Sequence, residues 1–256
     1  MFSKAKYIPL IFVLLVFSAA FVFAGPLEDC KEYAKLGVPG YDGKFLCRTG
    51  HLLSHSPEYK TPFWVIEHLT AEKASAKEFE RDKFRPDPDL QKGERAELAD
   101  YKGSGYDRGH MAPAADMKWD QQAMIECFYL SNMVPQNPPM NQIIWRILEE
   151  NVRNWAIDRG ELYIFTGPIY EGRTKKTIGK NKVAVPTHLY KIIYDPKKNE
   201  AIAFIMPNVK LNTEDMPTYI VTIREIEEKT GLDFLSELEK GLQDTIETAK
   251  AKDLWQ

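Results

Sequence analysis

The spacing of apolar residues along the chain predicts a protein built on a sheet with a few covering helices. Strand-like apolar runs, preceded by a hairpin-like stretch at 41–55, occupy 63–69, 128–134, 162–166, 189–194 and 201–206. Two other segments, 141–155 and 234–252, repeat with the period of an amphipathic helix. The charged segment 71–100 and the glycines that follow it predict an irregular approach to His110. Because no repeat or long linker divides the chain, the pattern predicts a single α+β domain.

The helix predicted from Asn141 carries polar side chains along one flank. Apolar residues such as Ile144 and Val152 mark its buried side. At about 100° per residue, Glu149 lies roughly 80° from Asn141 and about 12 Å further along the axis, whereas Glu150 lies on the far side. The same arithmetic puts Arg153 at about 120° from Asn141, so this flank carries an amide, a carboxylate and a guanidinium.

These side chains and His110 have complementary chemistry. A histidine has an ordinary pKa of about 6.5, so the neutral ring of His110 can accept a proton from water. The amide oxygen of Asn141 suits Mg²⁺, which prefers oxygen ligands and keeps several waters. A nearby carboxylate, here Glu149, then accepts hydrogen bonds from those waters. These are the parts needed to hydrolyse a phosphodiester.

The residues that carry this chemistry resemble those of a known family. The motif YDRGHMAP at 106–113, the run FYLSN at 128–132 and the spacing from His110 to Asn141 to Glu149 are similar to the DNA/RNA non-specific endonucleases of the ββα-metal superfamily. That family includes mitochondrial endonuclease G and secreted bacterial nucleases. The resemblance extends to FWV at 63–65, TGP at 166–168 and IEEKTGL at 226–232. It implies an α+β, ββα-metal (His-Me finger) nuclease fold with a mainly antiparallel central sheet flanked by helices.

The resemblance also implies roles for individual residues. His110 matches the family's general base, Asn141 its direct metal ligand and Glu149 the glutamate that orients metal-bound water. Arg108 matches the motif arginine, which lies close to the scissile phosphate. An upstream arginine that stabilises the pentacovalent phosphate corresponds to Arg81 or, if the alignment slips, to Arg85. Arg153 matches a further helix arginine found in some members.

The N-terminus has the three regions of a signal peptide. Lys4 and Lys6 precede an apolar run from residue 8 to 23, and small residues follow at Ala24 and Gly25. Cleavage after Ala24 leaves residues 25–256 as one domain, free of the membrane, and predicts a periplasmic or secreted protein. The alternative is an uncleaved membrane anchor, for which the run is short.

The charge balance restricts how nucleic acid is bound. Loss of Lys4 and Lys6 takes the formal net charge from −3 to −5, which argues against binding spread over the whole surface. A local patch is needed, and the loop 173–182 holds five cations and no acid. Its lysines, Lys175 and Lys176, are candidates for phosphate contacts; the alternative is an ordinary solvated loop.

The cysteines suit an oxidising compartment. Cys30 and Cys47 are close in sequence and predicted to form a disulfide, whereas Cys127 lies in an apolar run and is predicted to be a buried, free thiol. The histidines other than His110 are predicted to be structural, including His51 and His55, since Gly50 and Pro57 oppose the helix that would aim both at a metal.

The sequence thus predicts a metal-dependent endonuclease, using Mg²⁺ with Mn²⁺ as the alternative, that contacts DNA and RNA through phosphates. Two other classes stay open: a nucleic-acid binding or uptake protein that keeps the fold without turnover, and a phosphodiesterase of small nucleotides or lipids. The sequence also leaves a homodimer open.

Overall fold

A seven-stranded antiparallel sheet forms the centre of the molecule. The computed structural model describes residues 27–172 and 175–256. The strand order is β1-β2-β3-β6-β9-β10-β11, and every neighbouring pair is antiparallel. The strands are β1 (Lys44–Cys47), β2 (Leu52–Ser56), β3 (Thr61–Thr70), β6 (Glu161–Ile169), β9 (His188–Asp195), β10 (Glu200–Pro207) and β11 (Ile220–Val221). The predicted α+β class with a mainly antiparallel sheet is confirmed.

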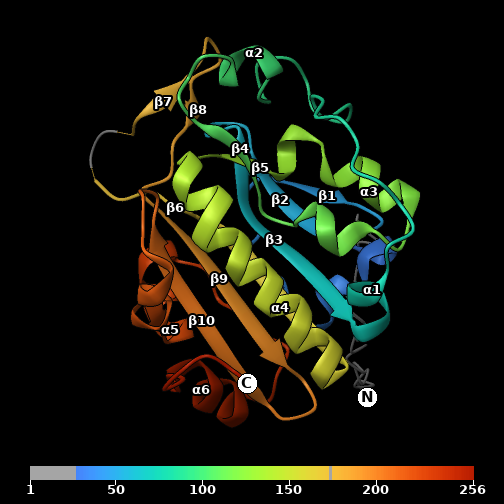
Figure 1. Cartoon of the computed structure of the whole chain (residues 1–256), viewed down its shortest axis with the longest axis vertical. Coiled ribbons are helices and arrows are strands. Elements are labelled where there is room, and N and C mark those ends of the chain that lie inside the picture. Colours follow the sequence, from blue (N-terminus) through green and yellow to red (C-terminus); the bar gives the residue numbers. More distant parts are fainter. Residues whose placement is uncertain (1–26, 173–174) are drawn as a thin grey trace, which may run out of the picture.

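The sheet is buried on both faces, so the protein has two main cores. On one face Val65, Ile164 and Ile193 pack in the cluster that includes the apolar side of helix α4 (Arg146–Arg159), and Figure 1 shows this helix lying across the sheet. On the other face residues such as Trp64 and Phe165 pack in a separate cluster with the C-terminal elements. Strands buried on both sides are rich in apolar residues at every position, as the sequence runs indicate.

Short elements complete the fold. The helices are α1 (Ala71–Ser75), α2 (Leu98–Tyr101), α3 (Gln121–Cys127), α5 (Ile223–Thr230) and α6 (Lys240–Thr248), and two small hairpins pair β4 (Asp107–His110) with β5 (Met133–Gln136) and β7 (Thr177–Ile178) with β8 (Val183–Ala184). Single 3₁₀ segments lie at Glu28–Cys30, Tyr33–Leu36, Ala114–Met117, Leu130–Asn132 and Thr213–Tyr219. No helix in the described parts of the chain is long and apolar enough to cross a membrane. The predicted signal peptide and the alternative anchor lie outside the described residues.

Two predicted elements differ from the structure. The strand expected at 128–134 begins only at Met133, because Asp120 caps α3 through the backbone N–H of Ala123 (2.8 Å) and this helix continues to Cys127. The helix expected from residue 234 begins only at Lys240. Leu235, just before it, has a φ of 53°, which is incompatible with a right-handed helix.

The cysteine predictions are confirmed. Cys30 and Cys47 form a disulfide that joins the N-terminal segment to β1, with 5.8 Å between their Cα atoms. Cys127 is free and buried, and burial raises the pKa of its thiol. Its sulfur packs in the core as a small apolar group.

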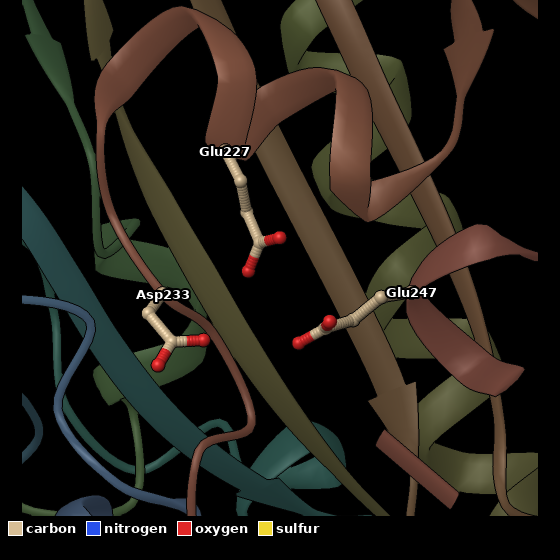
Figure 2. A group of neighbouring side chains, drawn as sticks. All are labelled: Glu227, Asp233 and Glu247. Atoms are coloured by element: carbon tan, nitrogen blue, oxygen red, sulfur yellow. The ribbon is translucent and has the colours of Figure 1, made fainter. Parts of the chain in front are cut away.

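An acidic cluster fastens the C-terminal helices to each other. Figure 2 shows the carboxylates of Glu227 on α5, Asp233 in the following loop and Glu247 on α6 pointing toward one another. Arg224 forms ion pairs with Glu227 (2.9 Å) and Glu247 (2.7 Å), and the Gln243 amide donates to Asp233 (3.0 Å) and Glu247 (2.8 Å). Because side chains of the protein already satisfy these oxygens, the cluster is an internal clamp.

The clamp makes stability depend on pH. Burial raises the pKa of Glu247 from 4.5 to about 7, with Glu227 adding to the rise and the Gln243 hydrogen bond opposing it. The folded protein therefore binds this proton more tightly than the unfolded chain, and the contribution of Glu247 to stability falls as the pH rises from 4.5 to about 7.

Glu247→Gln abolishes this titration. Between about pH 5 and pH 8, we expect its free energy of unfolding to fall less than that of the wild type, by up to about 3 kcal/mol. Urea unfolding at both pH values measures the difference; Glu58→Gln, an exposed carboxyl elsewhere, should follow the wild type. An equal fall in Glu247→Gln would contradict the assignment.

Candidate active site

A cavity of about 900 Å³ opens where β4, the start of the long helix and the irregular segment 80–106 meet. Six of the nine residues singled out from the sequence line it: Arg81, Arg108, His110, Asn141, Glu149 and Arg153. β4 pairs with β5, and β5 leads into the helix that carries Asn141 and Glu149. This short ββα unit therefore brings His110 and Glu149, the two ends of a 40-residue stretch, to one cavity.

His110 ends β4 with its ring held by two aromatic side chains. The ring makes an edge contact with Phe128 (centroids 4.9 Å apart) and a tilted contact with Phe84 (5.4 Å). Its Nε2 atom is buried and has no hydrogen-bond partner among the described residues. Burial, together with the smaller effect of the nearby Arg81 and Arg108 charges, lowers the pKa of His110 from 6.5 to about 3. The ring is therefore neutral at physiological pH and able to accept a proton.

Asn141 is oriented by a residue that sequence reasoning missed. Its Nδ2 donates to Oδ2 of Asp107 (2.9 Å), and Nε2 of Gln142 donates to the same oxygen (2.7 Å). Because the amide nitrogen is committed to Asp107, the amide oxygen of Asn141 is left for a ligand in the cavity. Asp107 belongs to the recognised motif, but nothing local in the sequence indicates that the helix start returns to it.

The helix begins one residue earlier than predicted and with wider turns. Residues Met140–Trp145 are π-helical, and α4 follows directly. The Asn137 side chain accepts from the backbone N–H of Met140 (3.3 Å) at this start. π-Helical turns occur frequently at functional sites. They change the angles calculated for a regular helix, yet Asn141 and Glu149 still line one cavity. Glu150 lines the cavity as well, but Glu149 is half-buried, whereas Glu150 is exposed and paired with Arg146 (3.0 Å).

Glu149 is close enough to several charged residues for them to affect its pKa. Burial raises the pKa of Glu149 to about 7; Lys191 and Arg153 oppose the rise, and Asp116 adds to it. Arg153 is paired with the buried Asp116 (2.9 Å). Lys191 is almost fully buried in β9, where its Nζ donates to Oγ1 of Thr166 (2.7 Å).

Glu67 of β3 is another acidic residue that the sequence analysis did not single out. It lies on the same face of the sheet as Lys191. It is 2% exposed, and burial raises its pKa well above the ordinary value. Glu67 and Lys191 were both detectable, since each interrupts an otherwise apolar strand run. A charged residue inside such a run predicts a buried polar site.

The two candidates for the upstream arginine, Arg81 and Arg85, differ in position. Arg81 lines the cavity and lies over the Phe128 ring (5.7 Å), and Arg108 lies over Phe84 (4.3 Å). Arg85 does not line the cavity and is paired with Asp82 (2.6 Å).

The two candidate lysines of the 173–182 loop lie outside the cavity. Lys175 contacts the ring and hydroxyl of Tyr59 and lies 3.7 Å from a Glu58 oxygen. Lys176 lies 5.0 Å from the ring centroid of Tyr106, which itself lines the cavity. Residues 173 and 174 lie outside the described residues.

The other histidines have structural environments, as expected. His51 is fully buried, and Nε2 of His55 donates to the backbone oxygen of Glu94 (2.8 Å). The two residues lie beside and on β2 rather than on a helix. His68 bonds to Glu32 and Glu161.

Comparisons with known proteins agree with this geometry. Residues 31–241 match the DNA/RNA non-specific endonuclease family. Mitochondrial endonuclease G of Homo sapiens is 37% identical over 219 residues, covering 80% of this chain and 73% of that protein. Nuclease C1 of Cunninghamella echinulata var. echinulata is 38% identical over 228 residues, covering 82% and 90%. A solved chain from the EndoG/EndoGI complex has a TM-score of 0.78 at 31% identity, covering 84% of this chain and 95% of that one.

The sheet, the ββα unit and the likeness to EndoG define a nuclease of the ββα-metal fold. The chain belongs to the DNA/RNA non-specific endonuclease family. It is therefore a nuclease, a hydrolase of phosphodiester bonds, and nucleases of this kind act on nucleic acid and depend on a divalent metal ion.

The predicted location is wrong by the same comparisons. A periplasmic or secreted protein was expected, whereas human endonuclease G and other relatives are mitochondrial by name. The Cys30–Cys47 disulfide is compatible with either location.

Proposed function

We propose that this chain is a Mg²⁺-dependent, sugar-non-specific endonuclease in which His110 is the general base and Asn141 the direct metal ligand. One observation carries the proposal. A neutral imidazole and a carboxamide already oriented by Asp107 line the same cavity, together with the guanidinium groups of Arg81 and Arg108.

His110 accepts the proton of the attacking water. Since Nε2 is buried while the ring still lines the cavity, Nδ1 is the nitrogen that receives it. The contacts with Phe84 and Phe128 fix the plane of the His110 ring, so little orientational entropy is lost when the ring accepts the proton. The positive charges of Arg81 and Arg108 hold the phosphate oxygens beside the ring and offset the negative charge that develops on them.

The oxygen donors fit a hard divalent ion. The amide oxygen of Asn141 would bind Mg²⁺ directly, and Glu149 would accept hydrogen bonds from the waters around it, a donor set that Mg²⁺ favours and Mn²⁺ tolerates. When bound, the ion supplies positive charge to the departing 3′ oxygen. Asp107 orients Asn141 by accepting a hydrogen bond from the Asn141 amide nitrogen. The ion pair between Asp116 and Arg153 lies near Glu149 and supports that part of the site. Arg153 then acts on the carboxylates more than on substrate.

Three further features complete the proposal. Residues 1–24 are a cleaved signal segment, which leaves residues 25–256 as the nuclease domain. Lys176 contacts a substrate phosphate beyond the cavity, with Lys175 beside it. Two such domains associate as a homodimer, which sedimentation at several concentrations would test.

Plasmid nicking with and without Mg²⁺ tests the function. We expect cleavage of DNA and of RNA only with the ion, and loss of activity with chelator or rising salt, because phosphate contacts are salt-sensitive and carry no sequence information. Attack by water should leave 5′-phosphate and 3′-hydroxyl ends, which ligate directly. Binding without turnover would favour the non-catalytic alternative, and cleavage of only a small chromogenic diester would favour the small-nucleotide phosphodiesterase. 2′,3′-Cyclic phosphate ends on RNA would refute water activation by His110.

A further inference from the structure

We propose that the cavity contains a nucleoside subsite in which Tyr106 stacks on the base of the nucleotide on the 5′ side of the scissile phosphate. The inference rests on the proposed function and names a residue that reads the substrate beyond its phosphate. The subsite is the end of the cavity lined by Leu98, Tyr101, Lys102 and Tyr106, called here the aromatic end.

The cavity is larger than the chemistry requires. Pockets that bind whole small-molecule ligands have volumes of about 300 to 1,000 Å³. At about 900 Å³, this cavity is at the upper end of that range. His110, Asn141 and Glu149 account for one part of it. The aromatic end is formed by other elements, α2 and the turn before β4. It therefore has room for a part of the substrate other than the reacting phosphate.

Tyr106 is held in place as a platform. It is half-buried, and its inner side packs on a small apolar cluster that includes Tyr101 and Met133. The turn before it is fixed by Ser104, whose hydroxyl donates to the Tyr101 carbonyl (2.8 Å) and accepts from the Tyr106 N–H (3.1 Å). Gly105 has a φ of 80°, a conformation that residues with a side chain rarely adopt. The glycine therefore allows the backbone path that places Tyr106.

The surroundings of Tyr106 suit a nucleoside. Leu98, on the same wall, is 40% exposed and gives an apolar contact. Two exposed cations are close: Lys102 lines the same end of the cavity, and Nζ of Lys176 lies over the Tyr106 ring, 5.0 Å from its centroid. An aromatic ring flanked by cations is the arrangement that binds single strands of nucleic acid, with a stacked base between contacted phosphates. Because every base has a π face, such stacking adds affinity without base preference.

The position of Tyr106 indicates which nucleotide it meets. Tyr106 directly precedes Asp107, and Asp107 bonds to Asn141, the proposed metal ligand beside the departing 3′ oxygen. His110 lies at the opposite end of β4, about 10 Å away at 3.3 Å per residue. Tyr106 is thus on the leaving-group side. The 3′ oxygen that departs belongs to the sugar on the 5′ side of the cut, so that nucleotide enters the aromatic end.

The test uses a short DNA strand with one cleavable linkage. A hexanucleotide carries a single central phosphodiester, and its other linkages are uncharged methylphosphonates. An abasic residue is placed on the 5′ side or the 3′ side of that phosphodiester. Wild type, Tyr106→Ala, Tyr106→Phe and the control Tyr41→Ala are compared with each strand; Tyr41 is 80% exposed and lies outside the cavity.

We expect Tyr106→Ala to lower kcat/KM about tenfold on the intact strand, mainly through KM, since stacking on one base is worth about that factor. Tyr106→Phe and Tyr41→Ala should match the wild type. The 5′ abasic strand should lower the wild-type value by a similar factor and show no further loss with Tyr106→Ala, whereas the 3′ abasic strand should leave the defect of Tyr106→Ala intact.

Other outcomes overturn the inference. An unchanged kcat/KM for Tyr106→Ala on the intact strand, or the same defect on the 5′ abasic strand, removes Tyr106 as the stacking residue. Loss of the defect on the 3′ abasic strand instead reverses the assigned direction. The abasic strands also test the wild-type subsite directly, so a folding defect in Tyr106→Ala cannot mimic the result. If the wild type cleaves no strand with Mg²⁺, the proposed function fails instead.

Discussion

His110→Ala is expected to lose about 10²-fold or more in kcat while binding DNA as the wild type does. General-base catalysis contributes about 10² to 10⁴-fold, and His110 is the proposed base. The ring is neutral because burial and the Arg81 and Arg108 charges lower its pKa to about 3, so almost all of the wild-type protein holds it in the reactive form at neutral pH. The alanine variant keeps the arginines that hold the phosphate, and binding should therefore persist.

Single-turnover cleavage with excess enzyme, beside a DNA-binding titration, measures the two effects separately. His188→Ala is the matched control, because that ring is half-buried at the start of β9 and outside the cavity. A thermal melt of each variant checks that loss of the Phe84 and Phe128 contacts has not unfolded the site. Near-normal cleavage by folded His110→Ala would remove the base from the mechanism.

The parts of the site that follow from the sequence are those whose spacing is local or fixed by a motif. His110, Asn141 and Glu149 were located by motif spacing, and the cavity brings them together. The period of the helix also predicted the buried Ile144, Leu148 and Val152. Local pattern is sufficient here because one helix and one hairpin carry most of the candidate residues.

What the sequence did not predict depends on contacts between distant segments. Asp107 reaches Asn141 across 34 residues, and Lys191 reaches Thr166 across 25, so neither pairing is visible in a local window. The apolar run at 128–134 resembled a strand. A capped helix before it and a 3₁₀ turn at Leu130–Asn132 delay the strand to Met133. Burial and distant hydrogen bonds override local preference at such points.

The different positions of Arg81 and Arg85 depend on the fold for the same reason. Both lie within the charged segment 71–100, where periodicity is weak because the segment has little regular structure. Arg85 is held near Asp82 by a short-range ion pair (2.6 Å), whereas Arg81 is free to line the cavity over Phe128. The difference is one of side-chain direction, which a sequence without periodicity does not encode.

Asn141→Ala is expected to be nearly inactive at any practical Mg²⁺ concentration. One neutral amide oxygen is the proposed direct ligand, so no other protein group replaces it when it is removed. Activity of the wild type should vanish with chelator and return with Mg²⁺, whereas the variant should not respond to added Mg²⁺. Cleavage rates over a Mg²⁺ titration measure this. Asp107→Asn should show an intermediate defect, since the amide of Asn141 loses the anionic acceptor that orients it.

Two neighbouring glutamates supply the matched comparison for this metal site. Glu149→Gln should require more Mg²⁺, by about 10 to 100-fold, and recover part of its activity when the concentration is raised, because Glu149 is proposed to hold the ion through water. Glu150→Gln should change little, since this carboxylate, although it lines the cavity, is exposed and already paired with Arg146. If Glu150→Gln proves the more damaging of the two, Glu149 is not the residue that supports the metal. Rescue of Asn141→Ala by Mg²⁺ to the level of Glu149→Gln would likewise mean that the amide is not the direct ligand.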